Sequence, residues 1–145
     1  MASDTEAVLA MVSRCSPMTL FHRFHGVTDG VAYTRGLFDN QLCDETLVAW
    51  RRSACVGLGT LSHDEDGIAH LGVLVEDASQ RRGVGGLLVS TLVNRARVGG
   101  VHKVHADVLI EDRFIVEALR RVGPLTVSFD VGKLSVDIDV GPPAW

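Results

Sequence analysis

The stretch SQRRGVGGLL, residues 79–88, places three glutamine or arginine side chains directly before a glycine cluster and an aliphatic run. A strand-like segment, VLVED at 73–77, precedes it, and a helical pattern begins at Val84. A helix N-terminus offers free N–H groups and partial positive charge, and glycines remove the Cβ atoms that would block a phosphate. The stretch therefore predicts a phosphate cradle, or else a tight strand-to-helix turn whose glycines only allow close packing.

Two common phosphate-binding motifs do not fit this stretch. A P-loop needs a Lys followed by Ser or Thr after its last glycine, and no such Lys follows Gly83 or Gly85. The dinucleotide fingerprint needs a third glycine, and Leu88 occupies that position. A P-loop nucleotidase and a Rossmann-type dehydrogenase are both disfavoured.

The elements around the stretch are typical of a mixed α/β domain. Residues 27–44 are expected to be a loop with one further helical turn, and Gly57 and Gly59 predict a bulge or a close backbone approach. Apolar periodicity predicts helices at 5–13, 84–98 and 111–123, a short helix or turn at 18–26, and strands at 45–52, 53–63, 68–77, 101–110, 125–130 and 133–140. The order is helices, an antiparallel meander, a βαβα unit and a closing hairpin.

Length and charge narrow the possible classes of protein. The 145 residues suit one domain over 1–145, and the Met start with a polar N-terminus suggests a whole protein. A net charge of −4 gives no reason to expect nucleic acid or an anionic membrane as partner. No apolar run reaches the roughly 18–20 residues of a membrane span, and no basic secretory start is present. We expect a cytoplasmic protein.

Metal binding is not favoured by the pattern of thiols and imidazoles. The cysteines show no pairing that would suggest a disulfide framework: Cys15, Cys43 and Cys55. A zinc site that combines them with His22 and His25 is conceivable, but the chain lacks C-x-x-C spacing. His102 and His105 are three apart on an expected strand and would face opposite ways. We predict ordinary buried thiols and no metal.

One family pattern fits the opening stretch well. QRRGVG at 80–85 matches Q/R-x-x-G-x-G/A, the acyl-CoA signature of the GNAT superfamily of N-acetyltransferases, and the chain resembles that family most clearly over 45–123. SPMTLFHRFHG at 16–26 and GVHKVHADVLIEDRFIVEALRRVG at 100–123 resemble its bacterial protein lysine acetyltransferase branch, where the domain is often fused to others. The resemblance implies a single GNAT-type domain with a mixed, mostly antiparallel central sheet flanked by helices.

The resemblance also implies acetyl-CoA as co-substrate and a set of residues that contact it. Backbone groups at the end of the central strand would bind the pantetheine arm, and loop amides would bind the pyrophosphate. The corresponding positions are Val73, Leu74 and Val75 for the arm, and Gln80, Arg81, Arg82, Gly83, Val84, Gly85 and Gly86 for the loop. Arg81 and Arg82 could add charge-assisted hydrogen bonds, or could be solvated loop charges. Asp112 stands where the family often has a cofactor-contacting Asn, and a carboxylate cannot donate an amide hydrogen bond.

The catalytic base is where the chain departs most from the family. A lysine amine, with a pKa of about 10.4, must lose a proton before it attacks. In the lysine acetyltransferase branch a Glu ten residues before the loop Gln accepts it, and here that position is His70. His70 could serve as the base, or could be a strand histidine satisfied by hydrogen bonds. Glu76, Asp77 and Glu111 are alternative bases that could equally be solvated loop charges.

The acid that the family often supplies is missing too. The second helix, RFIVEALRRVG at 113–123, contains no tyrosine, and the only one in the chain is Tyr33. The resemblance predicts an N-acetyltransferase in which a protein lysine or a small amine attacks the thioester directly. The missing Glu and Tyr favour the alternative of a catalytically weak acyl-CoA-binding sensor or regulatory module. An interaction domain whose loop binds nothing is a third hypothesis, and exposed sheet edges could support a homodimer.

Overall fold

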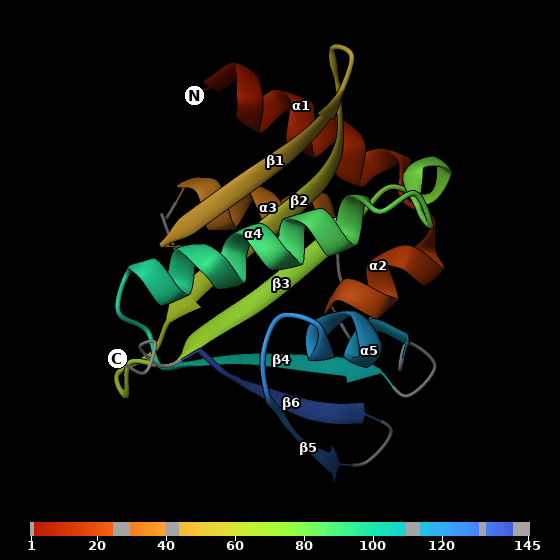
Figure 1. Ribbon diagram of the computed structural model, residues 1–145. Coiled ribbons are helices and arrows are strands. Elements are labelled where there is room, and N and C mark those ends of the chain that lie inside the picture. The colour runs from red at the N-terminus through yellow and green to blue at the C-terminus, as the bar shows by residue number, and fades with distance from the viewer. Residues whose placement is uncertain (1, 25–29, 40–43, 110–113, 131–132, 141–145) are drawn as a thin grey trace.

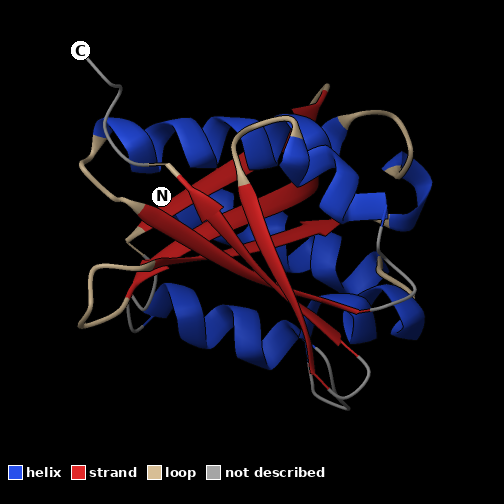
Figure 2. Ribbon diagram, turned by 60° about the horizontal axis from the view of Figure 1, so that its bottom comes forward, coloured by secondary structure: helices blue, strands red, loops and turns tan. Residues whose placement is uncertain are grey.

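A mixed sheet with helices on both faces forms the body of the molecule (Figures 1 and 2). The computed structural model describes residues 2–24, 30–39, 44–109, 114–130 and 133–140. The helices are α1 (Ala2–Arg14), α2 (Pro17–Phe24), α3 (Gly30–Asp39), α4 (Val84–Val98) and α5 (Phe114–Arg120), with a short 3₁₀ turn η1 (Asp77–Ser79). The strands are β1 (Glu45–Arg51), β2 (Ala54–His63), β3 (Ala69–Val75), β4 (Lys103–Leu109), β5 (Leu125–Asp130) and β6 (Lys133–Asp139). None of the described helices is long and apolar enough to cross a membrane.

The sheet is antiparallel except at its centre. Its strand order is β1-β2-β3-β4-β6-β5, and β3 and β4 are the parallel pair. Within the described residues that parallel ladder contains two pairs, Ala69 with Val104 and His70 with His105. Beyond His70 the two strands diverge, which Figure 1 shows as a widening angle between β3 and β4. The predicted mixed, mostly antiparallel sheet is confirmed.

Helix α4 covers one face of the sheet, and glycines in β2 let it approach closely. A Cβ on Gly59 would lie 2.7 Å from Leu92 Cδ1, and one on Gly57 would lie 3.1 Å from Leu88 Cδ1. Leu92 and Leu88 are buried in α4, and the helix spans the residues that its apolar period predicts. The expected close approach at these glycines is therefore confirmed. The pairing of β1 with β2 also shifts register at this point, because Ala49 pairs with Gly57 but Trp50 pairs with Cys55.

Helices α1 and α3 pack on the opposite face, over β1–β3. The buried side chains there come from α1 and from β2 and β3: Val8, Met11, Val12, Cys15, Cys55, Leu58 and Leu74. Polar side chains of β4 and β6 occupy the rest of that face, because strand residues alternate between the two sides of a sheet. One half of this face is therefore apolar and covered, and the other half carries histidine, aspartate and serine.

Several elements differ from the expectations. Residues 30–39 form the helix α3 rather than a loop with one turn, because Val31 and Phe38 pack against the apolar cluster under α1, which overrides two helix-weakening glycines. The third strand ends at Val75 instead of residue 77, because the chain turns into η1 there. Strand β4 begins at Lys103, so His102 precedes the strand. Residues 111–113 of the expected second helix lie outside the described residues, and α5 ends at Arg120 instead of residue 123.

Candidate functional site

The glycine loop joins β3 to α4 through two left-handed backbone positions. Arg81 has a φ of 62° and Gly83 a φ of 87°, and Gly83 is the N-cap residue of α4. The backbone N–H of Leu87 donates to the carbonyl oxygen of Gly83 at 3.0 Å, which closes the first helical turn. The N–H groups of Val84 to Gly86 therefore have no acceptor within the helix. They form a donor-rich, partly positive end at the surface.

The space around these glycines separates the two hypotheses for the loop. A Cβ built on Gly83 or Gly86 would meet no atom within 4 Å, and one on Gly85 would meet Val75 Cγ2 at an ordinary 3.8 Å. Close packing therefore does not require glycine at 85 or 86. At Gly59, by contrast, close packing does require glycine, because an added Cβ would clash with Leu92 of α4. The positive φ explains Gly83 alone. The first turn of α4, in which Gly85 and Gly86 have no side chain, fits a phosphate group, because a Cβ that could block its approach is absent at both positions.

The two arginines of the loop are available to an anion. Arg81 and Arg82 are exposed, and neither forms a hydrogen bond or ion pair with any residue in the described part of the chain. Arg81 also holds a left-handed conformation that non-glycine residues adopt rarely. Both guanidinium groups are free to add charge-assisted hydrogen bonds to a phosphate beside the helix end.

The end of β3 presents backbone groups toward the gap between the strands. The N–H of Glu76 donates to the carbonyl oxygen of Val56 at 3.0 Å, on the β2 side. Because consecutive strand residues direct their backbone groups to opposite sides, Val73 and Val75 direct theirs toward β4. The β4 ladder has already ended at His70. Leu74 pairs with Leu58 of β2 and is buried. Of the three predicted contacts for a pantetheine arm, Val73 and Val75 have the suitable orientation.

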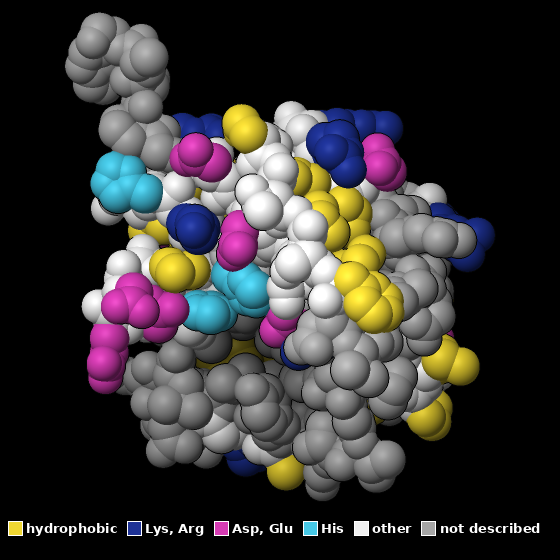
Figure 3. Space-filling model, turned by 90° about the horizontal axis from the view of Figure 1, so that it is seen from below, with side chains coloured by type: hydrophobic (Ala, Val, Ile, Leu, Met, Phe, Trp, Pro, Cys, Tyr) yellow, Lys and Arg dark blue, Asp and Glu magenta, His cyan; other side chains and the backbone are white. Residues whose placement is uncertain are grey.

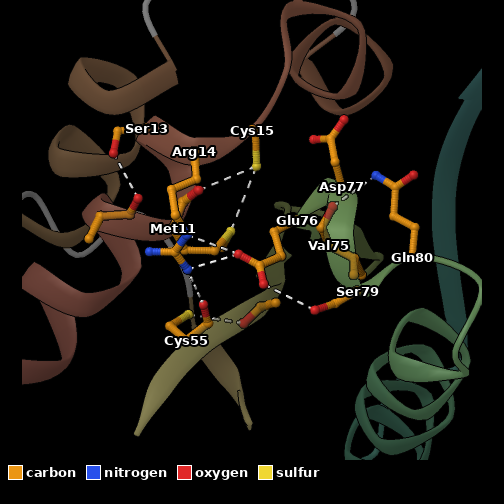
Figure 4. Close-up of polar contacts among 12 residues, drawn as sticks. Met11, Ser13, Arg14, Cys15, Cys55, Val75, Glu76, Asp77, Ser79 and Gln80 are labelled. Carbon is orange, nitrogen blue, oxygen red and sulfur yellow. Dashed lines mark hydrogen bonds and ion pairs between the residues drawn. The ribbon is translucent and has the colours of Figure 1, made fainter.

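Gln80 holds the loop in place through its side chain. Its Nε2 donates to the carbonyl oxygen of Val75 at 3.0 Å (Figure 4). The same Nε2 donates to Oγ1 of Thr19 in α2 at 3.1 Å. One amide thus joins the end of β3, the glycine loop and α2. This contact gives the glutamine of the motif a supporting task that its sequence position alone does not indicate.

Glu76 and Asp77 anchor the two N-terminal helices to the end of β3, and Figure 4 shows the contacts of Glu76. Glu76 Oε2 accepts from Arg14 Nη2 at 2.8 Å, and its Oε1 accepts from Ser79 Oγ at 3.0 Å. Asp77 Oδ1 accepts from the backbone N–H of Ser16 at 2.9 Å, and this bond holds the pKa of Asp77 below its ordinary value. Both carboxylates are engaged in structural contacts. Glu111, the other alternative base, lies outside the described residues.

His70 lies at the last paired position before β3 and β4 separate. Its Nε2 is 2.9 Å from Asp64 Oδ2, and its side chain is 48% exposed. Asp64 belongs to the turn between β2 and β3, and hydrogen bonds from His70 and the Ile68 N–H hold the pKa of Asp64 below its ordinary value. One ring nitrogen of His70 is therefore satisfied by a carboxylate, and the ring still faces solvent.

His105 sits beside His70 and is held by two carboxylates. The ring centroids of His70 and His105 are 5.4 Å apart. Nδ1 of His105 is 2.8 Å from Asp137 Oδ1, and its Nε2 is 3.0 Å from Asp107 Oδ1. Only a protonated ring donates from both nitrogens. Burial opposes the charged form, but the bonds to Asp137 and Asp107 outweigh it and raise the pKa of His105.

This cluster was not expected from the sequence, where His105 reads as one of several surface or strand histidines. Figure 3 shows histidine side chains against Asp and Glu side chains on this side of the molecule. The spacing of His105 and Asp107, two apart on one strand, was a visible signal. Asp137 joins them only because β6 pairs with β4 in a register that puts it opposite His105.

The cysteines and histidines considered as metal ligands are only partly described by the structure. No group of three or more potential ligands gathers among the residues that the structure describes. Cys15 and Cys55 are buried in the apolar cluster under α1, and burial, with Asp77 and Glu76 nearby, raises the pKa of Cys15 to about 11. Positions that lie outside the described residues are Cys43, His25 and Asp112, together with the side chains of His22 and Tyr33.

Comparison with known proteins adds a family and a fold. Residues 16–123 match the acetyltransferase (GNAT) family model. The chain is 28% identical over 148 residues to Acetyltransferase Pat of Mycolicibacterium smegmatis, covering 96% of this chain and 44% of that protein. It thus spans less than half the length of that relative.

Solved structures share the fold at lower identity. The GNAT domain of S. lividans PAT has a TM-score of 0.74 at 18% identity, covering 94% of this chain and 85% of that one. The structure of yncA from Salmonella typhimurium, solved with its cofactor acetyl-CoA, has a TM-score of 0.73 at 18% identity and covers 99% and 92% of the two chains.

Proposed function

The chain belongs to the GNAT acetyltransferase family, and from that premise we propose that it transfers the acetyl group of acetyl-CoA to a primary amine. The observation that carries the proposal is the glycine-containing first turn of α4 beside the diverging ends of β3 and β4. The yncA structure, which holds acetyl-CoA, shares this fold. The resemblance of residues 16–26 and 100–123 to the protein lysine acetyltransferase branch favours a protein lysine over a small amine as acceptor.

The phosphates of the cofactor would bind at the glycine loop. The N–H groups of Val84, Gly85 and Gly86 would donate to the pyrophosphate, and the guanidinium groups of Arg81 and Arg82 would add charge. The bound cofactor supplies a thioester, whose carbonyl carbon is the electrophile. The backbone groups of Val73 and the N–H of Val75, whose carbonyl oxygen already accepts from Gln80, would hold the pantetheine arm between the two strands. The arm would then run along β3 from the loop toward His70.

His70 would accept the proton that the acceptor amine must lose. An amine attacks only when it is neutral, and a lysine is almost fully protonated near neutral pH. His70 stands where the strands part and is half exposed, and its neutral imidazole has one ring nitrogen that can accept a proton. The neutral amine would attack the thioester directly, with a backbone N–H of β3 stabilising the developing oxyanion.

Two experiments test the proposal. Calorimetric titration with acetyl-CoA should show saturable binding that pantetheine without phosphates does not reproduce. A turnover assay with lysine peptides and small amines should show transfer that His70→Ala reduces by about 100-fold or more, with the acetyl-CoA Kd unchanged within about threefold. No binding at millimolar acetyl-CoA would overturn the proposal as a whole. Unchanged turnover in His70→Ala would overturn the base assignment alone.

A catalytically weak acyl-CoA sensor is the second candidate function. It is favoured by His70 in the place of the family's Glu and by the absence of tyrosine from residues 113–123. In a sensor the glycine loop would bind the cofactor as proposed, but no amine would be acetylated. Saturable acetyl-CoA binding without turnover on any amine of the panel would establish it.

A further inference from the structure

Asp64 uses its two carboxylate oxygens for two different tasks. Oδ1 accepts from the backbone N–H of Asp66 at 2.8 Å and of Ile68 at 3.0 Å, which closes the turn between β2 and β3. Oδ2 faces Nε2 of His70 at 2.9 Å. The turn is further closed by backbone bonds from Asp64 to Ile68 and from Gly67 to Asp64. The hydrogen bonds of the turn thus hold the Asp64 carboxylate in one orientation, with Oδ2 directed at Nε2 of His70.

This contact determines which ring nitrogen of His70 carries the proton. An ionised carboxylate only accepts hydrogen bonds, so the nitrogen that faces Asp64 must donate. In the neutral ring, Nε2 then carries the hydrogen and Nδ1 keeps its lone pair. Nδ1 of His70 has no hydrogen-bond partner among the described residues, and neighbouring His105 has both nitrogens engaged with Asp137 and Asp107. No described residue therefore occupies the lone pair of Nδ1.

We propose that Asp64 is a positioning residue for His70, which it holds in the Nε2–H tautomer so that Nδ1 accepts the proton of the acceptor amine. The inference rests on the proposed function. A protonated acceptor first gives one proton to solvent; as its neutral nitrogen bonds to the carbonyl carbon of the thioester, one of the two remaining protons passes to Nδ1, and the carbon–sulfur bond breaks. CoA leaves as the thiolate and takes up that proton from the imidazolium, which yields the acetylated amine and free CoA.

The substitution Asp64→Asn isolates this task from the turn. The amide oxygen can still accept from Asp66 and Ile68, while the amide nitrogen would donate to His70 Nε2 and force the hydrogen onto Nδ1. We expect kcat to fall by about 10- to 100-fold with little change in the Kd for acetyl-CoA. The matched control is Asp44→Asn, because it changes a second aspartate–histidine pair. Asp44, which directly precedes β1, has its Oδ2 2.8 Å from Nδ1 of His63 at the end of β2. That control should leave kcat within about twofold.

The tautomer itself can be observed without any activity. Nitrogen NMR of ¹⁵N-histidine-labelled protein, at a pH where the ring is neutral, should show His70 as the Nε2–H form in the wild type and as the Nδ1–H form in Asp64→Asn. A wild-type ring with its hydrogen on Nδ1 would overturn the inference. This measurement on the wild type stands even if the variant does not fold.

A double-mutant cycle separates positioning from a general structural effect. If Asp64 acts through His70, Asp64→Asn should not lower kcat any further in a protein that already carries His70→Ala. An equal loss in both backgrounds would overturn the positioning task. If His70→Ala impairs turnover but Asp64→Asn does not, this inference fails and the proposed function stands. If His70→Ala leaves turnover unchanged, the base assignment and this inference fail together.

Discussion

Arg14 Nη2 lies 2.8 Å from Glu76 Oε2 and 2.8 Å from the carbonyl oxygen of Cys55, so one guanidinium joins the end of α1 to two strands of the sheet. Glu76 directly precedes the turn that leads into the glycine loop. Its side chain is 14% exposed, so water replaces a lost partner poorly. The ion pair therefore fixes the strand end from which the loop departs.

Arg14→Ala should lower the free energy of unfolding by roughly 1–2 kcal/mol, because Glu76 and the Cys55 carbonyl lose their donor. Urea unfolding measures this. The control is Arg35→Ala, because Arg35 and Glu6 form a looser pair at 3.9 Å with both side chains half exposed or more. Its removal should change stability by less than about 0.5 kcal/mol. Equal losses in the two variants would contradict the anchoring role of Arg14.

Gly86→Ala should change stability and cofactor binding in opposite directions. The added Cβ meets nothing in the protein, and alanine favours helix over glycine by about 0.5–1 kcal/mol, so the free energy of unfolding should rise. The same Cβ would stand in the space that we assign to the pyrophosphate, so acetyl-CoA affinity should fall by about tenfold or more. Thermal unfolding and calorimetry measure the two effects.

Gly59→Ala is the contrasting variant for that experiment. Its Cβ would collide with Leu92, which is fully buried, so stability should fall by about 1–3 kcal/mol. Acetyl-CoA affinity of the folded protein should change less than in Gly86→Ala. If Gly86→Ala binds acetyl-CoA as tightly as the wild type, the first turn of α4 does not hold the phosphates.

The His105 cluster should make stability depend on pH. Because the pKa of His105 is raised above 6.5, the ring binds its proton more tightly in the folded state. Its contribution is full below the unfolded pKa and is lost as pH rises through the folded value. The pKa of Asp107 is lowered below 3.8, because His105 and Lys133 outweigh its burial, so its contribution is lost only in strong acid. The cluster should stabilise the fold most between about pH 4 and 6.5.

His105→Gln tests this dependence. The groups that face the ring are His70, Asp107 and Asp137, with Lys133 reaching Asp107 at 3.7 Å. The stability difference between wild type and variant, from urea unfolding, should be largest near pH 5.5 and should shrink above pH 7. A difference that stays constant from pH 5.5 to 8.5 would show that His105 contributes packing without a protonated ring.

Much of the architecture was predictable, because the spacing of apolar residues along the chain differs between helices and strands. The helix at 84–98 and the strands at 125–130 and 133–140 follow their apolar spacing closely. Helix α3 was missed, because its ten residues contain two glycines and gain their stability from packing on α1. Local propensity cannot report a gain that comes from another part of the chain.

The candidate site also has a part that the sequence predicts and a part that it does not. The glycine loop was predictable, because adjacent residues make a phosphate cradle and the family signature is local. The pairing of His105 with Asp137 was not, because it depends on the register of β4 and β6. Neither was the engagement of Glu76 by Arg14, which is 62 residues away.

By itself, then, the sequence determined the order of elements, the glycine loop and the substitution of His70 for the family's glutamate. Those features depend on residues that are neighbours in the chain, where backbone geometry and side-chain spacing act directly. Only the tertiary structure decided that β3 and β4 separate after His70, that the space over Gly86 is open, and that Asp64 faces His70 Nε2. These depend on strand register and on packing between distant segments, which no local pattern records.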